Sequence, residues 1–252
     1  MVNKMENFIR SYWKTVLFFA LVGLVGGFFT GLYLLDSYPE EIREEIYAEG
    51  LNDFLVAVIT AIQSAGYGLV LGTVGILLAQ NLGLWKDERA IARKPLIYTL
   101  IVSLAGGMTL ILSDIFFFGK YSEVIANSYV TKPTIPYLIA TVTYGAVIEE
   151  VMLRLFWMSL VAFILKKLLK REGTGIFVVA NIVAALLFAA GHLPATVLMI
   201  GSTPMIIFRC FLLNGGVGLL FGWLYRKYGL RYAMLAHGGC HIVSKLIWIL
   251  FI

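Results

Sequence analysis

The chain has 252 residues and a net charge of +5, with 60% hydrophobic and only 14% charged residues. Soluble domains carry about 25% charged residues, so this composition excludes an ordinary soluble domain and a disordered chain. Its two cysteines, Cys210 and Cys240, lie in apolar stretches, which excludes a disulfide-based secreted scaffold. The sequence instead predicts an all-α, polytopic transmembrane helical bundle.

Seven apolar runs follow one another along the chain, and a membrane-spanning helix needs about 20 such residues. The first run is longer than the roughly 7–15 apolar residues of a signal-peptide core, so we expect it to be a retained span. Residues 193–202 are interpreted either as a re-entrant segment or as part of the sixth helix. Together the runs predict one integral membrane domain, 1–252. The predicted spans are 14–35, 54–80, 96–118, 136–165, 176–191, 205–225 and 232–252.

Basic residues alternate with the predicted spans and indicate a cytoplasmic N-terminus. The outer segments are poor in Lys and Arg, and one of them, 36–53, is acidic. That acidic run is interpreted as a solvated connection, with recruitment of a basic peptide as the alternative. The basic residues are spread over the inner loops, so the net charge follows from topology and does not indicate nucleic acid. The inner basic residues are Lys4, Arg10, Lys14, Lys86, Arg89, Arg93, Lys94, Lys166, Lys167, Lys170, Arg171, Arg226, Lys227 and Arg231, and the outer ones are Arg43, Lys120 and Lys132.

Several ionisable residues fall inside the predicted spans, where a charge costs about 2.5–3.5 kcal/mol on insertion scales. Asp114 and Lys245 lie near span ends, where snorkelling to the interface is the simplest explanation. Arg209 is deeper, and facing a cavity to hold a substrate carboxylate is an alternative to a structural role. All three histidines of the chain also lie in or beside the late apolar runs. The full set is Asp114, Glu149, Glu150, Arg154, His192, Arg209, His237, His241 and Lys245.

The spacing of these residues separates two kinds of role. Glu150 and Arg154 are four residues apart and share a helix face, which predicts a structural ion pair with a supporting role at the site. Glu149 lies about 100° away around the helix and has no such partner. His237 and His241 are also four apart and project from one face of the last helix. The free carboxylate and the histidines are therefore the candidate reactive groups.

Register along the helices indicates that Glu149 and His192 meet, and that His237 joins them if the fourth and fifth helices project roughly 16 Å further into the cytoplasm. Glu149 lies about 24 residues before the turn at Gly173 and His192 about 19 after it, so on antiparallel helices they sit within about 8 Å in depth. Such a cluster can bind a divalent cation, and Glu149, His192, His237 and His241 are a plausible zinc set. It can equally activate water directly, with Glu149 and His192 as base and acid. Both interpretations indicate hydrolysis.

Three motifs at these positions resemble the CPBP family of intramembrane proteases, the CAAX-protease and bacteriocin-processing group. They are Glu149-Glu150-Val-Met-Leu-Arg154, Phe188-Ala-Ala-Gly-His192 and His237-Gly-Gly-Cys-His241, on separate late helices. The resemblance covers 135–252, which are predicted to be the catalytic helices.

The resemblance implies a multi-pass protease of the cell membrane that cleaves a membrane-associated hydrophobic peptide or protein tail. The substrates of relatives are of the CAAX type, or belong to peptide and bacteriocin processing. Glu149 and His192 would activate the attacking water, and His237 would stabilise the oxyanion or bind metal. The family often has Asn in place of His241. Because the family is described both as metalloprotease and as glutamate protease, zinc and a metal-independent mechanism both stay open.

Two other functions compete with proteolysis. A self-immunity or scaffold protein would use the same fold to bind a partner without cleaving it. A metal or ion transporter would use the histidines and glutamates for permeation. The transporter is disfavoured because the sequence lacks paired broken helices in two corresponding halves.

Overall fold

A computed structural model describes residues 2–86, 92–171 and 173–252, which form helices and connections without a strand. The basic residue Arg89, predicted in an inner loop, lies outside these ranges. The helices are α1 (Val2–Ser37), α2 (Glu40–Ala48), α3 (Asp53–Asn81), α4 (Arg93–Phe116), η1 (Phe118–Lys120), α5 (Glu123–Asn127), α6 (Ile135–Ala140), η2 (Thr141–Glu149), η3 (Val151–Met158), α7 (Ser159–Leu169), α8 (Thr174–Met199), α9 (Pro204–Cys210), η4 (Phe211–Gly216), α10 (Val217–Tyr228) and α11 (Leu230–Phe251).

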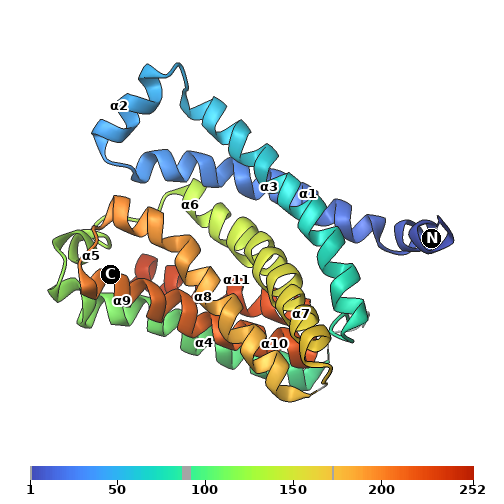
Figure 1. Cartoon of the computed structure of the whole chain (residues 1–252). Coiled ribbons are helices and arrows are strands. Elements are labelled where there is room, and N and C mark those ends of the chain that lie inside the picture. The colour runs from blue at the N-terminus through green and yellow to red at the C-terminus, as the bar shows by residue number, and fades with distance from the viewer. Residues whose placement is uncertain (1, 87–91, 172) are drawn as a thin grey trace.

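Helices α1 and α3 pack side by side along their lengths, and α2 connects them at one end (Figure 1). Small residues allow the close approach. A Cβ on Gly68 of α3 would lie 2.5 Å from the Phe19 carbonyl oxygen of α1, so a larger residue there would push the helices apart. The connecting helix α2 has no buried residue, which agrees with the solvated connection expected for 36–53.

One composite helix runs through α6, η2, η3 and α7, from Ile135 to Leu169. It contacts α1 and α3 on one side and α8 and α11 on another, while α4 packs against α11. Its middle, η2 and η3, is π-helical, a rare geometry that frequently occurs at functional sites. This helix contains the predicted fourth span, 136–165.

Six further stretches in the described ranges are long and apolar enough to cross a membrane. They correspond to the other six predicted spans, so the predicted polytopic helical bundle is confirmed. The prediction for 193–202 is wrong, because residues 193–199 extend the fifth predicted span as the end of α8. Pro194 lies within this helix, and membrane helices tolerate proline where neighbours satisfy the freed carbonyl.

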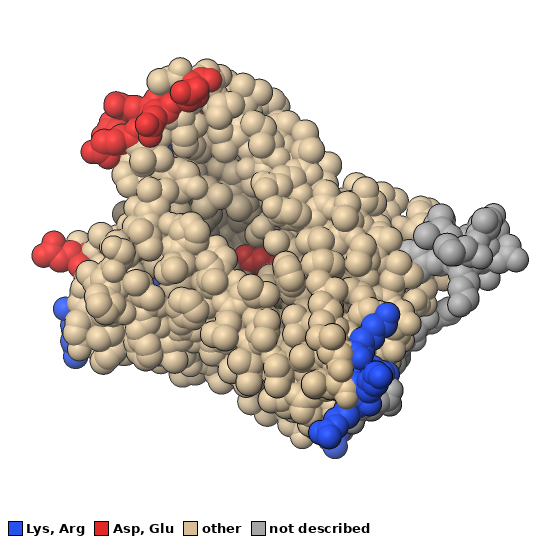
Figure 2. Space-filling view, in the orientation of Figure 1, with Lys and Arg blue, Asp and Glu red and all other residues tan. Residues whose placement is uncertain are grey.

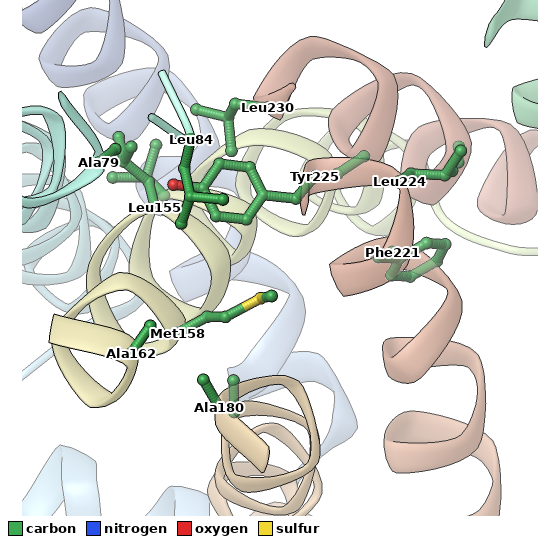
Figure 3. Packing of buried hydrophobic residues seen from close by; sticks show 14 of the residues in the cluster. Ala79, Leu84, Leu155, Met158, Ala162, Ala180, Phe221, Leu224, Tyr225 and Leu230 are labelled. Carbon is green, nitrogen blue, oxygen red and sulfur yellow. The ribbon is translucent and has the colours of Figure 1, made fainter. Parts of the chain in front are cut away.

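The main hydrophobic core lies where the composite helix meets α8, α10 and the start of α11. Figure 3 shows Tyr225 of α10 projecting among Leu155, Leu84 and Leu230. Its hydroxyl and that of Ser159 are 2.7 Å apart, so the buried phenol is hydrogen-bonded. This packing holds the composite helix, which carries the two adjacent glutamates, against the helices that carry the histidines.

Charged residues collect at opposite ends of the molecule. In Figure 2, Asp and Glu cover α2 at one end, and Lys and Arg cluster at the other, over the ends of α7 and α10. This distribution is the one expected from the alternation of basic and acidic loops. The orientation itself, with a cytoplasmic N-terminus, stays a prediction.

Candidate active site

Glu149 and Glu150 lie at the junction of the two π-helical segments, in the middle of the composite helix. Ile148 and Val151 on either side are fully buried and anchor this part of the helix in the bundle. The two carboxylates differ sharply in exposure: the Glu149 side chain is 16% exposed and that of Glu150 is 0% exposed. Adjacent acids therefore have different environments, as their spacing predicted.

Glu150 is held in a buried network. Arg154 Nη1 donates to Glu150 Oε1 at 2.9 Å, and Arg154 Nη2 donates to the Gly218 carbonyl oxygen at 2.8 Å. His237 Nδ1 lies 2.9 Å from the same Glu150 oxygen, and since an ionised carboxylate only accepts, this nitrogen donates. The predicted Glu150–Arg154 ion pair is confirmed. It also orients His237, a third member that sequence spacing could not supply.

His192 projects from α8 towards Glu149. Its Nδ1 lies 3.0 Å from the Phe188 carbonyl oxygen. Because a carbonyl can only accept, this nitrogen carries the proton and a neutral ring presents a lone pair at Nε2. That Nε2 is 3.7 Å from Glu149 Oε1. The separation is too long for a direct hydrogen bond and short enough for one water molecule to contact both groups.

The third group at Glu149 is His237 of α11, whose Nε2 lies 3.8 Å from Glu149 Oε2. Its ring is stacked on Phe221, with centroids 4.6 Å apart, and on His241, with centroids 5.0 Å apart. These two contacts and the hydrogen bond to Glu150 determine the ring orientation. His237 is therefore rigidly placed, whereas the His192 side chain is 37% exposed.

His241 is the most distant of the four predicted site residues from the Glu149 carboxylate. Its Nδ1 is buried without a hydrogen-bond partner in the described structure. A Cβ built on Gly145 would lie 3.3 Å from His241 Nε2 and 3.9 Å from Glu149 Oε2. Gly145 thus leaves a space between the histidine and the glutamate, and its position four residues before Glu149 is the sequence signal for that role.

The carboxylate of Glu149 therefore faces the rings of His192 and His237, and the three side chains come from three separate helices. Helix register predicted this approach for Glu149 and His192. Figure 2 shows a hollow in the molecular surface with Asp or Glu atoms visible at its floor. A partly exposed carboxylate between two imidazole Nε2 atoms can accept a proton from water, orient that water, or bind a cation.

The donor chemistry of this site suits zinc in kind, since carboxylate oxygen and imidazole nitrogen are its ordinary ligands. Among the described residues, however, no group of three or more His, Cys, Asp or Glu side chains is arranged to hold a metal ion. The zinc set of Glu149, His192, His237 and His241 stays a prediction.

Comparison with known proteins gives one family match, over the part of the chain that carries the site. Residues 131–243 match the family model described as type II CAAX prenyl endopeptidase Rce1-like. This part of the chain is similar to the Rce1-like family. The match contains all three sequence motifs and confirms the resemblance on which 135–252 were predicted to be the catalytic helices. No curated protein and no solved structure matches the chain significantly.

The structure corrects the snorkelling prediction for Asp114 and favours the structural role for Arg209 over its alternative. Asp114 does not snorkel, because it is only 2% exposed. Arg209 Nε and Nη2 donate to its two oxygens at 2.6 and 2.5 Å, and the Tyr129 hydroxyl donates to it at 2.7 Å. Arg209 is thus paired within the chain and is not free to hold a substrate carboxylate. Sequence reasoning missed this pair because its members are 95 residues apart.

The second corrected snorkelling prediction is that for Lys245. Its ammonium instead turns into the bundle, where Nζ donates to the Tyr137 hydroxyl at 2.9 Å and lies 4.4 Å from the centre of that ring. Lys245 lines the same apolar groove as His241. No local sequence signal marks this role, because Tyr137 is on another helix.

Proposed function

We propose that the protein is an intramembrane endopeptidase that hydrolyses a peptide bond in the hydrophobic tail of a membrane-associated peptide or protein. The observation that carries the proposal is the placement of the Glu149 carboxylate, partly exposed between His192 Nε2 and His237 Nε2 at 3.7 and 3.8 Å. The Rce1-like family match over the same residues and the multi-pass helical bundle support this class of reaction and a membrane-associated substrate.

The first step of the proposed reaction is activation of water. A water molecule between Glu149 and His192 gives one hydrogen bond to each acceptor, which leaves an oxygen lone pair for the substrate carbonyl carbon. As the new C–O bond forms, the Glu149 carboxylate takes the proton. His192 Nε2 orients the water, because Nδ1 is already engaged with the Phe188 carbonyl.

The second step is collapse of the tetrahedral intermediate. Negative charge develops on the former carbonyl oxygen, and His237 faces the site with its ring held by Glu150 and Phe221. We assign it the oxyanion, stabilised by an Nε2–H group when the ring is doubly protonated. The C–N bond then breaks, and the proton held by Glu149 passes to the leaving amine nitrogen. No other reactant is needed.

The buried Glu150–Arg154 pair has a positioning role in this proposal. It touches neither the water nor the substrate. It holds His237 through the Glu150 carboxylate and joins the composite helix to α10 through the Gly218 carbonyl. Proton transfer depends on such fixed geometry, since misplacement by about 1 Å can cost about a hundredfold in rate.

The proposal is tested by comparing peptide termini in cells that express wild type, Glu149→Gln or Glu44→Gln at matched levels. Glu149→Gln preserves side-chain size but removes the proton acceptor, so new termini should fall by about 10²–10⁴-fold. Glu44 lies on the exposed helix α2, and its variant controls for loss of a carboxylate elsewhere.

Termini produced equally by wild type and Glu149→Gln would contradict the proposed base. If wild type yields no new terminus while both folded proteins still confer a cellular phenotype, the non-cleaving immunity or scaffold function replaces proteolysis.

Whether cleavage requires zinc is tested separately on the purified protein. If the side chains alone activate water, cleavage survives exhaustive treatment with a zinc chelator. Loss of cleavage that zinc restores, together with zinc bound in proportion to protein and lost in His192→Ala, would instead support the predicted zinc set.

A further inference from the structure

A hydrogen-bonded pair of polar side chains lies near the middle of α3, in a part of the chain outside the family match. Gln63 Nε2 donates to the Tyr67 hydroxyl oxygen at 2.6 Å. Both residues are ten or more positions from either end of the span Asp53–Asn81, which is about 15 Å at 1.5 Å per residue. Gln63 is nevertheless exposed. Because an exposed amide at this depth is costly in hydrocarbon, its position indicates polar surroundings.

Tyr144 of the composite helix connects this pair to the candidate active site. Its side chain interacts electrostatically with both the Glu149 carboxylate and Tyr67. In this region α3 packs against η2 and η3, the segments that meet at the two glutamates. The hollow in Figure 2, with Asp or Glu atoms at its floor, opens beside α3, as comparison with Figure 1 shows. Tyr67 and its partner Gln63 therefore lie on the side of α3 that borders this hollow.

The pair presents one acceptor and one donor side by side. Gln63 uses its amide nitrogen on Tyr67, so its Oε1 remains an acceptor. The Tyr67 oxygen accepts that bond, so its O–H remains a donor. Within the described residues, neither group has a further hydrogen-bond partner. In an extended peptide, the N–H and C=O of one residue point to the same side, where a neighbouring strand supplies one acceptor and one donor. The pair offers these same two partners.

A substrate cleaved within a membrane needs such partners. A helical segment satisfies its own backbone groups, whereas the extended chain that presents a peptide bond for attack does not. Each unpaired backbone group is costly in hydrocarbon. A wall that supplies both partners beside the candidate base would offset this cost for the substrate residue next to it.

We propose that Gln63 and Tyr67 bind the main chain of one extended substrate residue. Gln63 Oε1 accepts its N–H, and the Tyr67 hydroxyl donates to its carbonyl oxygen. This inference rests on the proposed proteolysis and adds two substrate-binding residues to it. Because only main-chain atoms are held, the contact does not depend on the side chain at that position. It selects a segment that is extended, and not helical, at the site.

Binding tests the inference without requiring cleavage. The probes are fluorescent, lipid-anchored peptides of one apolar sequence. One is unmodified, and in each of the others a different peptide nitrogen carries a methyl group in place of its hydrogen. The protein is the full chain with Glu149→Gln in phosphatidylcholine nanodiscs. At one position, methylation should weaken binding about 2- to 13-fold more with Gln63 intact than in Gln63→Leu, the range for one neutral hydrogen bond. Comparing the two proteins removes the effect of the bulk of the methyl group.

The unmodified probe tests the second hydrogen bond. Tyr67→Phe keeps the ring and removes the hydroxyl, so it should weaken binding about 2- to 13-fold, and Gln63→Leu/Tyr67→Phe about 5- to 150-fold. Thr73→Val is the matched control on the same helix. The Thr73 hydroxyl donates to the Leu69 carbonyl oxygen within α3, so its loss should leave the affinity unchanged. Because Gln63 is exposed, Gln63→Leu should keep the Tm of the parent protein.

An equal cost of methylation with and without Gln63 at every position overturns the inference. So does unchanged affinity in both Gln63→Leu and Tyr67→Phe, or no binding of the unmodified probe. If Gln63→Leu converts a dimer into a monomer without a change in affinity, the pair joins two copies of the chain and the inference is wrong. Failure of proteolysis is a separate result, since wild type would leave the unmodified probe uncleaved while the dependence on Gln63 persists in Glu149→Gln.

Discussion

Replacing Arg154 by Met should destabilise the protein strongly, because it leaves the Glu150 carboxylate buried beside a single partner. Arg154 contributes two charge-assisted hydrogen bonds, to Glu150 Oε1 and to the Gly218 carbonyl. At about 1.5–3 kcal/mol each, they total about 3–6 kcal/mol. Breaking a buried ion pair from one side costs about 3–5 kcal/mol, which agrees. Methionine keeps an apolar, flexible side chain in the space, so the loss is mainly electrostatic.

The effect is measured by unfolding the purified protein in nanodiscs of fixed composition. For a chain of this size, about 2–4 °C of Tm corresponds to 1 kcal/mol, so Arg154→Met should lower Tm by roughly 6–20 °C. The double variant Glu150→Gln/Arg154→Met should lose less than the sum of the two single variants, because it no longer buries an unpaired charge. Glu149→Gln, which changes a partly exposed side chain, should shift Tm little.

Equal stability of Arg154→Met and Glu149→Gln would refute the division of the two adjacent acids into a structural and a reactive one. Strict additivity in the double variant would show that the two side chains do not depend on each other.

Two further changes test the site and its surroundings. Gly145→Ala puts a methyl group 3.3 Å from His241 Nε2, so kcat/KM should fall about ten- to a hundredfold while Tm changes little; Gly66→Ala, in open space, is the control and should leave activity intact. Burial and the Asp114 carboxylate raise the pKa of Tyr129 above its ordinary value of 10. The folded state therefore favours the neutral phenol, and the stability this provides below pH 10 is lost as pH rises further. Tyr129→Phe should lose about 1 kcal/mol at pH 7 and show a shallower decline in stability as pH rises above 10 in unfolding measurements; an equal decline would contradict this role of the phenol.

The parts of the site that sequence predicts are those set by helix periodicity. Glu150 and Arg154 are one turn apart, so their pairing follows from any helical geometry. The approach of Glu149 to His192 follows from counting residues on either side of a turn. By contrast, the bond from His237 to Glu150 joins residues 87 apart and could not be read from spacing.

The sequence predictions that were wrong also depend on tertiary packing. Asp114 and Lys245 were assigned to the interface because a charge near a span end can reach water at little cost. Whether it does depends on what the neighbouring helices offer. Asp114 meets Arg209, and Lys245 meets Tyr137 from the composite helix. Likewise, α8 continues through Pro194 to Met199, although proline removes one backbone hydrogen bond of the helix.

The sequence by itself determined that the chain is a helical membrane protein, where its spans fall and which motifs could carry chemistry, because hydropathy and periodicity are local properties. Only the tertiary structure decided which groups share a site. It placed Glu149 between two imidazoles, enclosed Glu150, paired Arg209 and left Lys245 facing a groove. Those outcomes depend on the relative rotation and depth of packed helices, which no single helix specifies.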